Sequence, residues 1–348
     1  MNPILALFIY YMLMMGTIMV LMSSHWLLIW IGFEMNLMAM IPIMTYKQNP
    51  RSTESAIKYF LIQTTASIMF IMSTSINLML TGQWTVMHIN NNMLSFTITI
   101  SMLMKLGVAP FHLWLPEVTQ GLHLYSSMIL LTWQKIAPLS ILYTMYPSLN
   151  HNIMFISAIL SIMLGGWGGL NQTQLRKMMA FSSIAHMGWM MAILCYNPNI
   201  MIFNLFIYMI MTITLFMIFK NNSSTNMSNL SIICNKSPIT ASLLALVLLS
   251  LGGLPPLSGF LPKWLVTQEL IKNNNMIMAS IMLMLSLINL FFYMRLIYST
   301  SLTIFPSMNN MKMYWLYSKS IKYSSLMTSF SIMSILMLPL MPLLTNFY

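Results

Sequence analysis

The chain is a series of apolar runs, each about as long as a membrane-spanning helix, separated by short polar loops. A helix needs about 20 apolar residues to cross the hydrocarbon core of a bilayer. Hydrophobic residues fill 58% of the 348 positions and charged residues only 5%, whereas a soluble domain has about 25% charged residues. The pattern excludes a soluble enzyme, a nucleic-acid-binding domain and a disordered chain, and it predicts an all-α polytopic membrane protein. The 43 Met residues are scattered among the apolar runs, so we interpret them as apolar filler and not as a copper relay.

We expect eleven transmembrane helices, of which the fourth and ninth are too long for one crossing and contain Gly and Pro. Each of these two is predicted to be one discontinuous helix. The first span has no basic segment before it and no cleavage site after it, so it does not resemble a signal peptide. The predicted spans are Pro3–Met22, Trp26–Thr45, Tyr59–Leu80, Met93–Thr119, Tyr125–Met145, Asn152–Leu170, Met178–Cys195, Ile200–Phe219, Ile239–Ile271, Met276–Tyr298 and Ser324–Thr345.

Basic loop residues gather on one side of the predicted membrane. The loops on the N-terminal side hold ten of them, whereas the opposite loops hold only Lys272. The positive-inside rule therefore places the N-terminus in the cytoplasm-equivalent compartment and, after eleven spans, the C-terminus on the other side. Ser299–Tyr323 is expected to lie along the inner interface, and Arg295 is expected to snorkel from the inner end of its span. The ten residues are Lys47, Arg51, Lys58, Arg176, Lys177, Lys220, Lys236, Lys312, Lys319 and Lys322.

The two interrupted spans share one order of residues: Leu-Gly-x-x-Pro, then Leu-Pro, then Thr-Gln. These segments are Leu106–Pro110, Leu115–Pro116 and Thr119–Gln120 in the first, and Leu251–Pro255, Leu261–Pro262 and Thr267–Gln268 in the second. The spans lie five apart, an odd number, so the units that contain them must have opposite orientations, as in inverted-repeat transporters. Gly and Pro are also common in membrane helices in general. We predict a first five-helix repeat over residues 1–145, an inverted second repeat over 146–300, and an interfacial segment with a C-terminal helix over 301–348.

Several ionisable residues are predicted to lie near the middle of the membrane. A charge there costs roughly 2.5–3.5 kcal/mol on insertion scales, so each such residue is a functional candidate. At one depth they would form a chain along the membrane plane. The candidates are Glu34, Lys105, Lys135 and Lys263 for proton transfer, and His112 and His186 for a relay. Other interpretations remain: a structural ion pair of Glu34 with Lys105, a snorkelling Lys263, and histidines that only pack.

A buried lysine can act as a proton switch. The pKa of a lysine in water is about 10.4, loss of water lowers it, and a nearby carboxylate raises it. Movement of Glu34 relative to Lys105 would therefore control whether the lysine holds its proton or passes it on through Lys135 towards Lys263.

Three other features have simpler interpretations. Glu54 and Lys58 are spaced as an i,i+4 ion pair on the first turn of a helix. The glycine-rich run Gly165–Gly169 indicates close helix packing. Cys195 and Cys234 predict neither a disulfide framework nor a metal site.

Three motifs resemble the antiporter-like subunits of respiratory complex I: Trp30–Asn36, Lys105 followed by Gly107–Pro116, and Pro255–Lys263. The resemblance covers essentially the whole chain. The length, the Met-Asn-Pro-Ile start and the abundant Met are similar to the animal, mitochondrially encoded members, whereas bacterial members have three more N-terminal helices. In this family the residues that match Glu34, Lys105, Lys135 and Lys263 carry protons.

The resemblance implies a proton-translocating subunit of NADH:ubiquinone oxidoreductase in the mitochondrial inner membrane, with its N-terminus in the matrix and its C-terminus in the intermembrane space. No residue pattern predicts a metal or redox centre in this chain, so NADH, FMN, iron–sulfur clusters and ubiquinone are expected in partner subunits. The expected partners are other membrane-arm subunits and lipids such as cardiolipin, with no nucleic acid and no homo-oligomer. Two alternatives are a stand-alone cation/proton antiporter and a purely structural membrane subunit.

Overall fold

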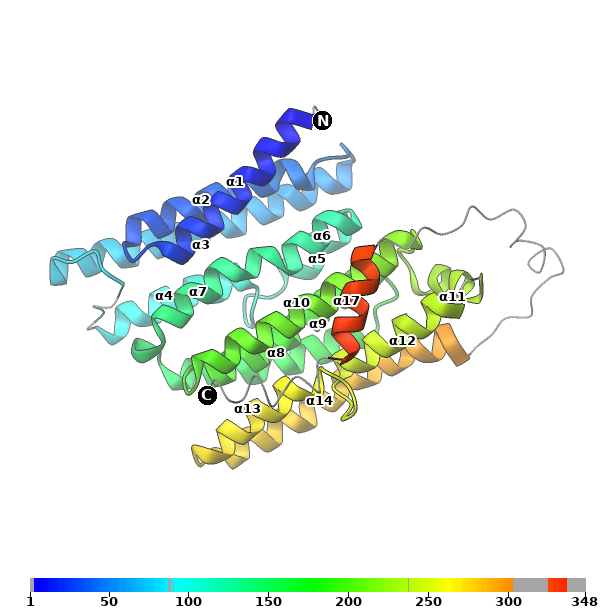
Figure 1. The fold of residues 1–348 in the computed structure, drawn as a ribbon. Coiled ribbons are helices and arrows are strands. Elements are labelled where there is room, and N and C mark those ends of the chain that lie inside the picture. Colours follow the sequence, from blue (N-terminus) through cyan, green and yellow to red (C-terminus); the bar gives the residue numbers. More distant parts are fainter. Residues whose placement is uncertain (1–2, 87–88, 90, 237, 303–324, 337–348) are drawn as a thin grey trace. The chain divides into compact units, whose positions relative to one another are not determined.

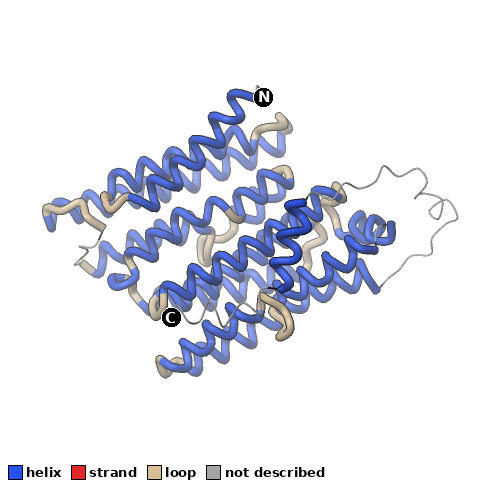
Figure 2. Tube along the Cα trace, viewed as in Figure 1, coloured by secondary structure: helices blue, strands red, loops and turns tan. Residues whose placement is uncertain are grey.

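The computed structural model describes residues 3–86, 89, 91–236, 238–302 and 325–336 (Figure 1). These residues form helices joined by short loops, and no strand occurs among them (Figure 2). Six of the described helices are long and apolar enough to cross a membrane. They are α1 (Pro3–Met22), α2 (Trp26–Met44), α3 (Pro50–Thr81), α8 (His151–Leu170), α10 (Pro198–Asn221) and α14 (Met276–Ile297). The prediction of an all-α polytopic membrane protein is therefore confirmed.

Further helices occupy most of the remaining predicted spans. Between α3 and α8 they are α4 (Asn92–Leu106), α5 (Trp114–Gly121), α6 (Leu124–Leu131), η1 (Trp133–Lys135), α7 (Ile136–Thr144) and η2 (Tyr146–Ser148). The others are α9 (Leu175–Leu194), α11 (Met227–Lys236), α12 (Pro238–Gly252), α13 (Phe260–Lys272), η3 (Tyr298–Leu302) and α17 (Ser325–Leu336). Two differences from the sequence prediction are that α3 begins well before Tyr59 and that α11 fills a predicted loop.

The chain packs as two compact units. Unit 1 consists of Met1–Leu164 and Ser183–Pro198, and unit 2 consists of Gly165–Ser182 and Asn199–Tyr348. The division passes through α8 and α9, so the two parts of each of these helices pack in different units.

Both predicted helix breaks are present. α4 ends immediately before Gly107, whose φ of 68° is a left-handed conformation that favours glycine. α12 ends immediately before Gly253, whose φ is 82°. The second halves, α5 and α13, each have Pro at their third position, Pro116 and Pro262. Proline is tolerated there because the first N–H groups of a helix have no intrahelical acceptor.

A third break lies inside the fifth predicted span, Tyr125–Met145. α6 ends at Leu131, and the 3-10 turn Trp133–Lys135 joins it to α7. Pro138 explains the break, because it lacks the N–H that would bond to the carbonyl of Gln134 and its ring crowds that carbonyl. The prediction of one continuous fifth helix is therefore wrong, and Pro138 is the residue that signals the break.

Among the described residues, one isolated antiparallel bridge joins two segments that flank helices in each unit. His25, just before α2, pairs with Thr85, just after α3. Gln174, just before α9, pairs with Asn226, just before α11. In the first bridge the amide of Trp26 donates to the carbonyl of Trp84 at 3.1 Å. In the second the amide of Leu175 donates to the carbonyl of Thr225 at 3.0 Å. The first bridge thus joins the segment before the second predicted span to the segment after the third. The second bridge joins the segment before the seventh span to the segment after the eighth, which is the matching place five spans later.

The glycine-rich run of α8 packs closely against α14, as predicted. A Cβ on Gly166 would lie 2.9 Å from Oδ1 of Asn289, and one on Gly169 would lie 3.1 Å from the ring of Phe292. Only glycine allows this approach without a shift of the neighbouring side chains.

Arg295 does not snorkel, and that prediction is wrong. Its guanidinium donates to the carbonyl of Leu170, the last residue of α8, and to the carbonyl of Gln172 at 2.8 Å. The last carbonyls of a helix have no intrahelical donor, so the forked arginine head stabilises the end of α8 instead of reaching the membrane surface.

Several sequence predictions fall outside the described residues. They concern most of Ser299–Tyr323, with Lys312, Lys319 and Lys322, and the parts of the last predicted span, Ser324–Thr345, on either side of α17. Within these segments the structure describes a π-helical turn, η3, and the helix α17.

Candidate functional site

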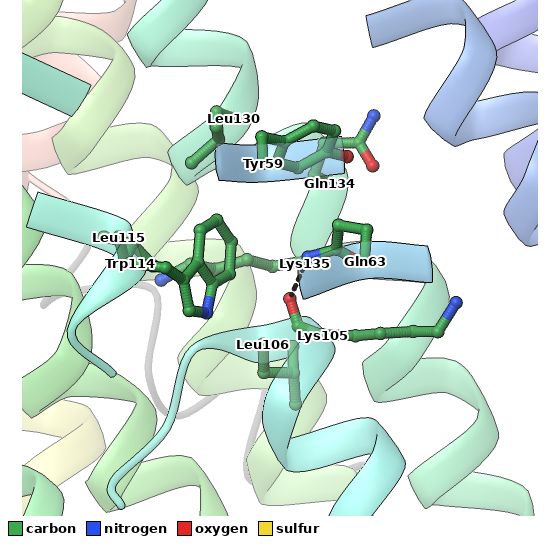
Figure 3. Close-up of a pocket in the computed structure, with 9 residues that line it drawn as sticks. All are labelled: Tyr59, Gln63, Lys105, Leu106, Trp114, Leu115, Leu130, Gln134 and Lys135. Carbon is green, nitrogen blue, oxygen red and sulfur yellow. Dashed lines mark hydrogen bonds between the residues drawn. The ribbon is translucent and has the colours of Figure 1, made fainter. Parts of the chain in front are cut away.

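Lys105 lies in the last turn of α4, directly before the break at Gly107, and is only 8% exposed. Its backbone carbonyl belongs to the end of the helix, where carbonyls have no intrahelical donor. Gln63 of α3 supplies the donor: its Nε2 lies 3.3 Å from the carbonyl oxygen of Lys105 (Figure 3). The break is therefore held by a side chain from a neighbouring, continuous helix.

The ammonium group of Lys105 faces an aromatic ring. Its Nζ lies 3.8 Å from the centre of the Phe33 ring. Glu34, the next residue of α2, is half-buried and lies within electrostatic range of Lys105, but the two side chains form no ion pair in the described structure. A cation–π contact thus takes the place of the structural ion pair that the sequence also allowed.

Lys135 is 3% exposed and lies in the 3-10 turn between α6 and α7. Lys135 and Lys105 line one cavity, and their side chains extend away from each other (Figure 3). The cavity leaves about 20 Å³ for the centre of a water molecule, which is room for at least one water. Its lining residues are Tyr59, Gln63, Lys105, Leu106, Trp114, Leu115, Leu130, Gln134 and Lys135.

Two hydrogen-bond donors of the cavity lining have no partner. Nε1 of Trp114 and Nε2 of Gln134 are both buried without an acceptor. An unpaired buried donor costs roughly 1–3 kcal/mol, so this lining favours a polar occupant such as water.

Lys263 lies after the second break, inside unit 2, and is 9% exposed. Its Nζ donates to the carbonyl oxygen of Gly252, the last residue of α12, at 2.7 Å. The side chain is buried and hydrogen-bonded, so Lys263 does not snorkel.

The two histidines do not line the cavity. His112 lies in the loop between α4 and α5 and is 8% exposed, and its Nδ1 lies 3.3 Å from the carbonyl oxygen of Pro110. His186 is half-buried in α9. Of the six candidates, the structure thus brings Lys105 and Lys135 to one cavity and places Glu34 within electrostatic range of Lys105.

The uncharged polar residues of the site are not among the residues predicted from the sequence. Tyr59 and Gln63 lie on one buried face of α3 that begins with Ser52 and Ser55. Their spacing of three or four residues inside an otherwise apolar helix is the signal that could have identified them.

An ion triad lies on α3 and α5. Lys58 contacts both Glu54 and Glu117, at 2.9 Å each, and all three side chains are substantially exposed. The predicted pair of Glu54 with Lys58 is confirmed, and Glu117 is an additional partner that ties α5 to α3.

The fold and the site define the class of protein: a polytopic, all-helical membrane protein with buried lysines beside broken helices. Residues 23–289 match the family described as NADH:quinone oxidoreductase/Mrp antiporter, TM, and residues 290–345 match NADH dehydrogenase subunit 2 C-terminus. The chain belongs to the NADH:quinone oxidoreductase/Mrp antiporter family.

Curated relatives match over nearly the whole chain. The chain is 56% identical over 345 residues to NADH-ubiquinone oxidoreductase chain 2 of Bos taurus, which covers 99% of both chains. It is 57% identical over 342 residues to the protein of the same name from Rhinoceros unicornis, which covers 98% of both.

Solved structures share the fold at low sequence identity. A chain of respiratory complex I from Thermus thermophilus with bound aureothin has a TM-score of 0.83 at 22% identity, and the match covers 95% of this chain and 77% of that one. A chain of the Mrp complex from Dietzia sp. has a TM-score of 0.81 at 14% identity, covering 97% and 75%. At these identities the similarity concerns the fold alone.

Proposed function

We propose that this chain is a proton-translocating membrane-arm subunit of NADH:ubiquinone oxidoreductase (complex I), driven by redox chemistry in partner subunits. The observation that carries the proposal is the cavity between two buried lysines, Lys105 and Lys135, each beside a helix break. The names of the curated relatives support the assignment to this complex. The match to a subunit 2 C-terminus favours it over a stand-alone antiporter.

In this proposal Glu34, Lys105, Lys135 and Lys263 carry protons, and His112 and His186 are further relays. The Phe33 ring and the nearby Glu34 both stabilise the charged form of Lys105. The lysine side chains diverge (Figure 3), so transfer from Lys105 to Lys135 needs a bridging water at the cavity. Movement at the breaks changes these distances and thereby the direction of transfer.

The drive comes from outside the chain. Moving one charge across 100 mV costs about 2.3 kcal/mol, so the relay cannot run without coupling. NADH, FMN, iron–sulfur clusters and ubiquinone belong to the partner subunits in this proposal. The partners are other membrane-arm subunits and lipids, among them cardiolipin.

The proposed location is the mitochondrial inner membrane, with eleven spans, the N-terminus in the matrix and the C-terminus in the intermembrane space. The excess of basic residues in the loops on the N-terminal side supports this orientation. Two inverted repeats, over residues 1–145 and 146–300, are supported by the matching breaks at Gly107 and Gly253 and by the matching bridges.

The test is proton translocation by the intact complex. In mitochondrial membranes that carry Lys105→Met, we expect assembled complex that oxidises NADH but moves fewer protons for each NADH oxidised. An unchanged ratio would refute the relay. The purified chain alone in liposomes should show no cation/proton exchange, and exchange by it would support the antiporter alternative.

A further inference from the structure

At the two helix breaks, different side chains cap the end of the first half-helix. At each break the first half-helix ends with carbonyls that have no intrahelical donor. At the second break Lys263 itself donates to the carbonyl of Gly252, at 2.7 Å. At the first break the donor is an amide: Gln63 reaches the carbonyl of Lys105 from a neighbouring helix.

From this difference we infer that Gln63 is a positioning residue for Lys105. Its amide takes the capping role that Lys263 takes at the second break, and it thereby leaves the ammonium group of Lys105 available for proton transfer. The inference rests on the proposed proton-relay function and assigns to it a residue that carries no charge.

The surroundings of Gln63 suit this role. It is 7% exposed and lies in α3, which continues without a break for 32 residues. A continuous helix is a firmer support than the loop that follows α4. The C-terminal end of α4 is the negative end of its dipole and attracts a cation. Without the amide of Gln63, the ammonium group of the nearest lysine would be attracted to this helix end.

The side chain of Lys105 in fact extends away from that helix end. It runs to the side opposite Lys135 (Figure 3) and reaches the Phe33 ring. The hydrogen bond from Gln63 fixes the backbone from which this side chain starts. Loss of the bond would let the end of α4 move and would change the distances from the ammonium group to its neighbours.

Three other titratable groups surround Lys105 on separate elements. Glu34 of α2 interacts with it electrostatically, and Tyr59 of α3 and Lys135 of η1 line the same cavity. Displacement of Lys105 changes its distance to each of them, so the pH profile of proton translocation should shift. A purely structural cap would leave that profile unchanged.

The experiment compares Gln63→Met with Thr65→Val in the intact complex. Met has nearly the size of Gln but no donor, whereas Thr65 is exposed on the other face of α3 and bonds only within its helix, to the carbonyl of Ile62. We expect Gln63→Met to raise amide hydrogen exchange at Gly107 and Val108 by roughly 2- to 12-fold, the loss of one hydrogen bond. It should also lower the protons moved per NADH and shift their pH profile, while Thr65→Val changes none of these.

Unchanged exchange in Gln63→Met would overturn the inference, and so would faster exchange with an unchanged pH profile. If Gln63→Met does not assemble, Gln63→Leu also lacks a donor, adds no charge beside Lys105 and is measured with the same readouts. Lys105→Met is measured alongside: if it leaves proton translocation normal, the proposed relay fails, whatever the exchange at Gly107 shows.

Discussion

The ammonium nitrogen of Lys105 lies 3.8 Å from the centre of the Phe33 ring, although Glu34 is the next residue along α2. The ring stabilises the cation without accepting a proton from it. Phe33 is itself held by Phe70, whose ring meets it edge to face at 5.8 Å. Glu34 lies about 100° further around the axis of α2 and acts on Lys105 only through its electrostatic field.

Replacement of Phe33 by Leu should remove the cation–π contact with Lys105. A cation–π contact contributes about 0.5–2 kcal/mol, so we expect the complex to assemble but to move fewer protons per NADH. Phe70→Leu is the matched control, because Phe70 contacts Phe33 and Trp26 and not the ammonium group. Equal losses in both variants would show that only packing matters.

The double variant Glu34→Gln with Lys105→Met separates a relay from a structural role. The two residues form no ion pair in the described structure, and apolar replacements of buried charges are often tolerated. We expect an assembled complex with impaired translocation, measured as protons moved for each NADH oxidised. Normal translocation by this variant would contradict the proton-carrying role.

Gly253→Ala should disturb the second break. The residue has a φ of 82°, where alanine costs roughly 1–2 kcal/mol, and its Cβ would lie 2.8 Å from Nζ of Lys263. We expect a lower temperature of thermal inactivation and reduced translocation. Gly252→Ala is the control, because its Cβ would lie 3.7 Å from Leu290, an ordinary contact. Equal tolerance of both changes would show that the break does not depend on Gly253.

Arg295→Lys tests the role of the guanidinium at the end of α8. Arginine donates to the carbonyls of both Leu170 and Gln172, and a lysine head cannot reproduce this fork. We expect Arg295→Lys to lower the thermal stability of the complex by roughly 1–3 kcal/mol, and Arg295→Met to lower it further. If Arg295 only snorkelled, Arg295→Lys would leave the thermal stability of the complex unchanged, and that result would contradict the prediction.

Hydropathy and helix breakers predict much of this fold. The first span, Pro3–Met22, is found with the predicted bounds, because a run of that length has no other stable form in a bilayer. The breaks at Gly107 and Gly253 follow from glycine and proline in the sequence. The break beside Lys135 could have been predicted in the same way, from Pro138. The bridge of His25 with Thr85 could not have been predicted, because it joins loops through backbone groups alone.

The charged residues of the site could be predicted, and their neighbours could not. Lys105 and Lys135 stand out because charges are rare in apolar runs. Which groups they contact depends on side-chain directions and on the packing of separate helices. Hence the sequence suggested Glu34 as the partner of Lys105, whereas the structure places Phe33 there. Gln63 carries no charge, and its role follows only from its distance to a backbone carbonyl.

The length of α3 has an electrical consequence. Its 32 residues span about 48 Å, more than the roughly 30 Å of a bilayer core. From the exposed Lys58 to Gln63 the helix rises only about 8 Å, whereas from Gln63 to Thr81 it rises about 27 Å. The greater part of any voltage along this helix therefore falls between Gln63 and Thr81. In the proposed relay, a proton at the level of Gln63 therefore has the shorter electrical distance towards Lys58 and the longer one towards Thr81.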